Sequence, residues 1–468
     1  MAEESTTGRG SGDEVRLAAA PGDPVFANAG SGTDVAATPS ADPDGAPDVD
    51  AAAMASATSD VAVGSFGDYL RSWAGRVRHG ESGMLPVLVG LVIIVVLFQT
   101  QSSAFLSPGN LVNLIVQGAA LIVLGMAEVF VLLLGEIDLS IGYVAAVGAV
   151  VTVALSSSDL GPNLPWWLAI IVGLAVAGVI GGLQGLLITR LGLPSFVVTL
   201  AGLLGWQGVL LYLVNHIGGS NGGIIRITNA VISDFAYGTL TPLVGWIVMI
   251  VAVAIYALLA LRKNLRRRAS GLVVQPIALL GAKIGVIAIA GVVVVAVCNI
   301  NRGAAGATLR GVPWVVPIII AVLVLWTFLL GRTRFGKYIY AIGGNAEAAR
   351  RAGINLTRIR LGAFILGAVT AGIAGIIYAS TLGNISANVD GGQLVLYAVA
   401  AAVIGGTSLF GGHGKMVHAL VGGIIVAVIN NGMGLIGLSA PVQLIVTALV
   451  LLAAVIVDAV ARRGRTAG

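Results

Sequence analysis

The stretch Arg332–Arg360, RTRFGKYIYAIGGNAEAARRAGINLTRIR, lies between two long apolar segments and contains a short helix whose two ends are both marked. Gly343 and Gly344 interrupt whatever precedes this helix. Asn345 is a residue type that caps helix N-termini, and Glu347 places a negative charge in the first turn, where the helix dipole favours it. The sequence therefore predicts a helix that begins directly after Asn345.

The C-terminal end of this helix is marked as well. Arg350 and Arg351 suit the last turn, and Gly353 occupies the position where a left-handed residue ends a helix. A helix of about two turns is marginal alone in water. Its caps therefore suggest a coupling helix that docks onto a partner protein, and an ordinary basic loop is the alternative. The candidate coupling residues are Gly343, Gly344, Asn345, Glu347, Ala348, Ala349, Arg350 and Gly353.

The composition places the chain in a membrane. Of the 468 residues, 57% are apolar and only 10% are charged, whereas about a quarter of the residues of a soluble domain are charged. The single cysteine, Cys298, excludes an internal disulfide and a cysteine-based metal site, and four scattered histidines show no zinc spacing. The excess of basic residues is typical of membrane-protein loops, so we expect no nucleic-acid partner.

A membrane-spanning helix needs about 20 apolar residues. That requirement predicts an all-α polytopic membrane protein with about 10–12 transmembrane helices. Residues 1–68 read as a disordered acidic cytoplasmic tail, and residues 69–83 read as a possible interfacial helix. The transmembrane domain is expected over 84–461, with a cytoplasmic loop at 331–360 and a short cytoplasmic tail at 462–468. The twelve candidate spans are 84–101, 111–134, 141–157, 166–189, 194–215, 243–261, 277–299, 313–330, 361–382, 393–410, 417–434 and 441–460.

The basic residues test this topology. With twelve spans and both termini inside, 17 lysines and arginines after residue 84 fall in inside loops and three in outside loops. This bias follows the positive-inside rule and places Arg332–Arg360 in the cytoplasm. We therefore expect a multi-pass membrane protein with both termini in the cytoplasm.

Few polar groups lie within or beside the spans. Glu128 lies inside one, where an ionisable residue suggests a functional site, although a structural hydrogen-bonded role is the stronger alternative. Asp138 could cap a helix that starts near Leu139, with Ser140 assisting. The sequence shows no catalytic cluster and no phosphate-binding GxxxxGK[ST] loop. If transport uses ATP, the ATPase must be another chain.

Four motifs together resemble the permease subunits of carbohydrate ABC importers of the ribose/xylose type. The motifs are GEIDLSIGYVAA (Gly135–Ala146), LPSFVVTLAGLLGWQG (Leu193–Gly208), YAIGGNAEAARRAGI (Tyr340–Ile354) and AVAAAVIGGTSLFGGHGK (Ala398–Lys415) followed by NNGM (Asn430–Met433). The extra pair of spans near 277–299 and 313–330 looks most like the xylose branch. Glu136 departs from the pattern, since the family usually has glycine there.

The resemblance implies a transport subunit rather than an enzyme, and a monosaccharide, xylose or a similar pentose, as substrate. It implies that Gly343–Gly353 contacts an ABC ATP-binding subunit, which would hold ATP and Mg, so that this chain binds no cofactor. Further implied partners are an extracytoplasmic sugar-binding protein, a second permease copy in a homodimer and membrane lipid. Candidate substrate-pathway residues are Glu128, Asp138, Ser140 and Asn431. An ion-coupled secondary transporter, a membrane enzyme and an ABC permease for another small solute are the alternatives.

Overall fold

The computed structural model describes residues 85–218, 223–271, 276–303 and 307–466. The expected tail at 1–68 and interfacial helix at 69–83 lie outside these residues. The described chain is almost entirely helical, as predicted. Its elements are α3 (Leu85–Gln101), α4 (Pro108–Leu132), α5 (Ile141–Ser156), α6 (Trp166–Arg190), α7 (Ser195–Gly218), β1 (Ile224–Arg226), α8 (Ala230–Tyr237), α9 (Pro242–Ala269), α10 (Ile277–Asn299), α11 (Val315–Arg332), α12 (Arg334–Gly344), α13 (Ala346–Arg351), α14 (Leu356–Leu382), β2 (Asn384–Ser386), α15 (Gly391–Ile404), α16 (Met416–Leu435) and α17 (Ala440–Thr466).

Each of the twelve expected spans falls on one of these helices. Eight helices are long and apolar enough to cross a membrane: α4, α6, α7, α9, α10, α11, α14 and α16. The other four segments, on α3, α5, α15 and α17, contain shorter apolar stretches. The chain is therefore a multi-pass membrane protein.

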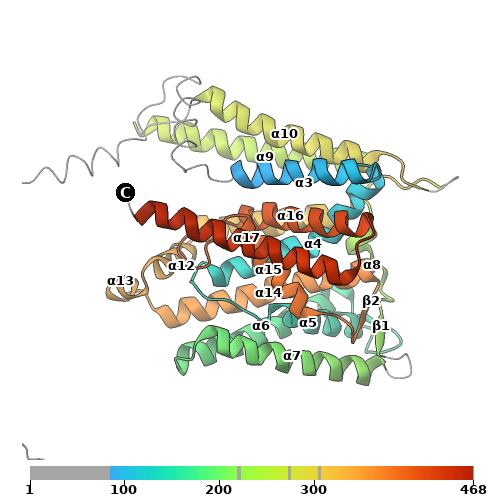
Figure 1. Cartoon of the computed structure of the whole chain (residues 1–468), viewed down its shortest axis with the longest axis horizontal. Helices are drawn as coiled ribbons and strands as arrows, with labels where there is room; N and C mark the ends of the chain where they lie inside the picture. The colour runs from blue at the N-terminus through green and yellow to red at the C-terminus, as the bar shows by residue number, and fades with distance from the viewer. Residues whose placement is uncertain (1–84, 219–222, 272–275, 304–306, 467–468) are drawn as a thin grey trace, which may run out of the picture. The chain divides into compact units, whose positions relative to one another are not determined.

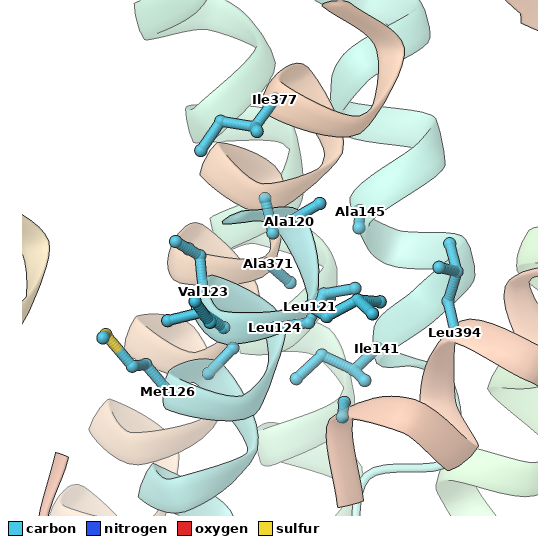
Figure 2. Packing of buried hydrophobic residues seen from close by; sticks show 14 of the residues in the cluster. Ala120, Leu121, Val123, Leu124, Met126, Ile141, Ala145, Ala371, Ile377 and Leu394 are labelled. Atoms are coloured by element: carbon cyan, nitrogen blue, oxygen red, sulfur yellow. The ribbon is translucent and has the colours of Figure 1, made fainter. Parts of the chain in front are cut away.

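Helix α4 lies at the centre of the helical core. It packs against α14, α16 and α15, and α14 in turn packs against α5 and α6. Figure 2 shows Leu124 and its neighbours on α4 beside Ile141 of α5, Ala371 of α14 and Leu394 of α15. Helices α9 and α10 expose most of their apolar side chains instead, as expected of helices whose neighbour is lipid.

Glycine allows some of these helices to touch backbone to backbone. A Cβ atom added at Gly375 of α14 would overlap the carbonyl oxygen of Ala145 on α5. A Cβ atom at Gly422 of α16 would likewise overlap the carbonyl oxygen of Ala401 on α15. Lipid provides little hydrophobic driving force for helix association, so van der Waals packing between small residues supplies the attraction.

The two ends of the helical core differ (Figure 1). Helices α12 and α13 lie together at one end, which we call the α13 end, while α8, β1 and β2 lie at the other, the α8 end. Strands β1 and β2 pair antiparallel, with Ile225 opposite Ile385. Sequence analysis predicted neither this pair nor α8 and α12, because three-residue strands and short amphipathic helices give weak patterns beside long apolar spans.

We predict that the Gly375→Ala variant is less stable than the unsubstituted protein by about 1–3 kcal/mol, the usual cost of overpacking. Thermal unfolding of the purified protein in detergent measures this loss. Gly208→Ala in α7 is the matched control, because no atom lies within 4 Å of its added Cβ and alanine favours a helix by about 1 kcal/mol. Equal unfolding temperatures for the two variants would contradict the proposed close contact.

Candidate functional site: a capped surface helix and a buried polar network

Helix α13 has the caps that the sequence predicted. The side chain of Asn345 accepts a hydrogen bond from the Ala348 amide at 2.9 Å. At the other end the Gly353 amide donates to the Arg350 carbonyl and the Ile354 amide donates to the Ala349 carbonyl. Gly353 has a φ of +81°, so the helix ends in a Schellman motif.

Glu347 forms ion pairs with two arginines on the surface of α13. Its Oε1 atom lies 2.9 Å from Arg350 Nη2 and 3.2 Å from Arg351 Nε. All three side chains are more than half exposed. Exposed pairs of this spacing contribute only about 0.3–0.5 kcal/mol each. They therefore hold the charged groups in one arrangement more than they stabilise the fold.

The candidate coupling residues divide into an exposed set and a set that faces the protein. Ala349 is buried and Gly343 is half-buried. The exposed residues are Gly344, Asn345, Glu347, Ala348, Arg350 and Gly353. Helix α13 thus keeps one small side chain against its own chain and presents a polar surface outward.

Helix α12, which sequence analysis missed, connects α13 to the helical core. Thr333 caps it by accepting a hydrogen bond from the Gly336 amide at 3.2 Å. Ile339 and Ile342 are buried on its inner face, and the Tyr340 hydroxyl donates to the Gly414 carbonyl at 2.8 Å. The signal that could have found α12 is this spacing of apolar residues in YIYAI.

Four glycines bring three segments together at the end of α12. We call Gly135, Gly343, Gly411 and Gly412 the glycine junction. A Cβ atom on Gly343 would overlap the Leu133 carbonyl oxygen, and the Gly412 amide donates a hydrogen bond to that same oxygen at 2.9 Å. The end of α4, the end of α12 and the loop between α15 and α16 are therefore in direct backbone contact.

Directly beyond the junction, Asp138 and Ser140 of the turn between α4 and α5 form a buried polar network with Glu128 of α4 and Gln184 of α6. The Asp138 amide donates to Glu128 Oε1 at 3.2 Å. Asp138 Oδ1 accepts from the amide and the hydroxyl of Ser140, at 2.9 and 2.6 Å. Gln184 Nε2 donates to Ser140 Oγ at 2.7 Å. All four side chains are at most 3% exposed.

This network brings together three of the four candidate substrate-pathway residues. Glu128, Asp138 and Ser140 share it, and the bond to the Asp138 amide fits the structural, hydrogen-bonded alternative for Glu128. Asn431 lies elsewhere, paired with Asn110. Sequence analysis missed Gln184, whose signal is a single amide within the glycine-rich span GLAVAGVIGGLQG.

Asp138 does not cap a helix as the sequence predicted. Helix α5 begins at Ile141 rather than near Leu139, and its N-cap residue Ser140 makes no side-chain capping bond. Asp138 instead accepts from the Ser140 amide, one residue ahead of the helix. Ser140 does not cap the helix either, because its hydroxyl donates to Asp138 and accepts from Gln184.

An ion pair that the sequence did not suggest joins the same turn to α14. Glu136 Oε1 lies 2.5 Å from Arg360 Nη2, with side chains 6% and 34% exposed. Burial raises the pKa of Glu136, and the Arg360 guanidinium opposes that rise. Glu136 therefore has a charged partner in Arg360.

No group of three or more histidine, cysteine, aspartate and glutamate side chains that could hold a metal lies within the described ranges.

The family model described as the permease component of the branched-chain amino acid transport system matches residues 110–455. The chain belongs to this permease family.

Three permease proteins each match about four fifths of this chain. The chain is 36% identical to the xylose transport system permease protein of Escherichia coli K12, over 81% of this chain and 92% of that protein. It is 32% identical to the xylose permease protein of Haemophilus influenzae, over 80% and 95%. It is 30% identical to the D-allose transport system permease protein of E. coli K12, over 79% and 89%. No solved structure gives a significant match.

This permease is thus a membrane-spanning transport subunit, as its similarity to the xylose-type permeases led us to expect, and not an enzyme. The resemblance to the ribose/xylose-type family is confirmed, and the xylose branch is among the most similar relatives.

We predict that the Arg360→Met variant of this permease is destabilised by about 2 kcal/mol, less than the ~3–5 typical of a fully buried pair because Arg360 is partly exposed. Without the arginine the folded-state pKa of Glu136 rises further above its unfolded value. The loss of stability should therefore be small near pH 5 and grow as the pH rises to 8. Thermal unfolding against pH measures it.

The double variant Glu136→Gln with Arg360→Met is the control, since it removes both charges. Its stability should exceed that of Arg360→Met at pH 8 and change little with pH. A deficit in Arg360→Met that is the same at both pH values would exclude the Glu136 charge as its cause.

Proposed function

We propose that this permease is the membrane-spanning subunit of an ATP-driven ABC importer for a monosaccharide, with xylose or a similar pentose as the substrate. Two xylose permease proteins and a D-allose permease protein are among its relatives. The observation that carries the proposal is the capped surface helix α13, because a helix of six residues is marginal alone and its polar face is left exposed.

In this proposal α13 docks into a separate ATP-binding subunit. ATP and Mg bind to that subunit, and this chain binds neither. Closure of the ATPase would move α13 and α12 as one piece, since Asn345 is both the C-terminal cap of α12 and the N-cap of α13. The glycine junction would then pass the displacement to the end of α4 and to the buried polar network.

Charge supports the orientation. The α13 end would face the cytoplasm of a bacterial cell, together with both termini, because the inside loops defined by twelve spans carry the basic residues. The α8 end would face an extracytoplasmic sugar-binding protein. A second copy of the permease would complete a homodimeric core within the lipid.

We predict that cells carrying this permease with its ATP-binding subunit and sugar-binding protein take up labelled D-xylose, and that ATP depletion stops uptake while an uncoupler alone does not. The reason is that ATP, and not a proton or sodium gradient, would drive transport. Transport then needs no path of carboxylates within the membrane. Uptake that survives ATP depletion and collapses with the uncoupler would indicate an ion-coupled transporter. Uptake of leucine in place of D-xylose would indicate a different cargo.

We also predict that replacing Glu347 and Arg350 by alanine reduces co-purification of the ATP-binding subunit and lowers uptake at least tenfold. The double variant should fold normally, because both side chains are exposed and their pair contributes little. Pull-down of the ATPase and thermal unfolding of the permease separate the two effects. Replacing Arg262 and Lys263 of α9 by alanine also removes two exposed charged side chains, but outside α13, and is the control. Normal pull-down and uptake would remove α13 from the coupling role.

A further inference from the structure

A row of amide side chains lies on one face of α4 near the α8 end. Asn110, Asn113 and Gln117 are spaced by three and four residues, so they share that face. From Gly118 onward, most of α4 is buried. These three side chains, in contrast, are half-buried or exposed.

Asn431 of α16 pairs with this row. Asn110 and Asn431 exchange two hydrogen bonds, of 2.8 and 3.1 Å, and Asn431 also donates to Gln117 at 3.5 Å. Asn113, between them, makes no hydrogen bond to the described part of the chain. Its amide is therefore free to bind water or a solute.

At the depth of Gln117, the innermost residue of this row, lipid is an unfavourable neighbour. With a rise of about 1.5 Å per residue, Gln117 lies roughly 9 Å beyond the expected start of this span at residue 111. That is well inside a hydrocarbon layer of about 30 Å. Polar groups at such a depth face protein or a water-filled space, because hydrocarbon offers them no hydrogen bonds.

A cavity of about 300 Å³ lies beside Asn113. This volume is at the lower end of the range for small-molecule sites. One wall of the cavity comes from α4, and the other comes from α8 and from the segment that precedes α11. The lining contains both polar and apolar groups. The cavity is lined by Gly109, Val112, Asn113, Val116, Ala236, Tyr237, Thr239, Arg302, Leu309 and Pro313.

Arg302 brings a fixed set of donors to this cavity. Its Nη1 donates to the Cys298 carbonyl and, at 3.5 Å, to the Ile300 carbonyl, and its Nη2 donates to the Gly311 carbonyl at 3.3 Å. A guanidinium has five N–H donors in a rigid plane, so donors remain for a solute after these contacts. The half-buried side chain is held in position before any solute arrives.

Arg302 comes from the connection between α10 and α11, and backbone bonds hold the end of that connection against α8 and α9. The Leu240 amide donates to the Val312 carbonyl at 2.8 Å, and the Trp314 amide donates to the Gly238 carbonyl at 2.9 Å. The extra helix pair thus supplies one wall of the cavity as well as the arginine.

We propose that this cavity is the monosaccharide entrance of the permease, where Asn113 and Arg302 bind sugar hydroxyls and the amide row from Asn110 to Gln117 continues the path inward. The inference rests on the proposed function. Amides both donate and accept hydrogen bonds, as hydroxyls do. Val112, Val116 and Leu309 offer apolar surface to the C–H faces of the sugar ring.

The first test measures whether water and sugar reach the position of Asn113. The only native cysteine, Cys298, is buried, so Asn113→Cys introduces a single reactive thiol. In proteoliposomes, a charged, membrane-impermeant thiol reagent should modify it at least tenfold faster than Ile289→Cys, whose position on α10 is 66% exposed on an apolar helix. D-xylose should slow modification of Asn113→Cys at least threefold, and leucine should not.

The second test measures transport by the complete importer. Asn113→Leu, which keeps the volume and removes the amide, should lower D-xylose uptake at least tenfold without changing ATPase co-purification. Asn113→Gln should recover part of the uptake because it restores the amide. These effects differ from those of a merely structural residue, which would change folding and recovery of the protein instead.

Three outcomes would overturn the inference: slow modification of Asn113→Cys equal to that of Ile289→Cys, modification indifferent to D-xylose, or wild-type uptake by Asn113→Leu. Failure of the proposed function would show differently, as an absence of monosaccharide uptake by the unsubstituted importer. Failure of the entrance alone would appear only in the variants.

Discussion

Close contact between backbones, made possible by glycine, is the constraint on which this structure depends. The Leu133 carbonyl oxygen, at the end of α4, accepts a hydrogen bond from Gly412 and lies against Gly343. No residue with a Cβ atom fits at Gly343 unless these segments move apart. Since lipid does not drive helices together as water does, shape at such contacts decides which helices are neighbours.

This contact also links the surface to the interior. Helix α13 is capped at both ends and its charged face is exposed, so a partner can reach it. Helix α12 places Gly343 at the junction, and the turn beyond contributes Asp138 and Ser140 to the network that they form with Glu128 of α4 and Gln184 of α6. A force applied at α13 therefore meets a short series of packed and hydrogen-bonded groups that ends inside the helical core. A buried network of this kind has few alternative arrangements, because each broken bond leaves a polar group unsatisfied.

At the opposite end the polar groups are arranged differently. The network near α13 is buried and bonds within itself, but two of its acceptors, Glu128 Oε2 and Gln184 Oε1, have no hydrogen-bond partner in the described chain. At the α8 end, the Asn113 side chain lines a cavity together with Arg302, which donates to three backbone carbonyls. One end of α4 thus holds a buried polar set and the other a set open to a cavity, which agrees with a force-receiving end and a solute-receiving end. The open set depends on the connection between α10 and α11, and so on the extra helix pair.

The sequence by itself determined the membrane class, the twelve apolar segments and the boundaries of α13, because these follow from hydropathy and from capping residues a few positions apart. Only the tertiary structure decided that Gly343 touches Leu133, that Arg360 pairs with Glu136, that Gln184 completes the network, and that Asn431 joins Asn110 rather than Asp138. Those contacts join residues from 44 to more than 320 positions apart. They depend on the rotation of each helix about its axis, and in nearly uniform apolar spans the sequence pattern does not fix that rotation.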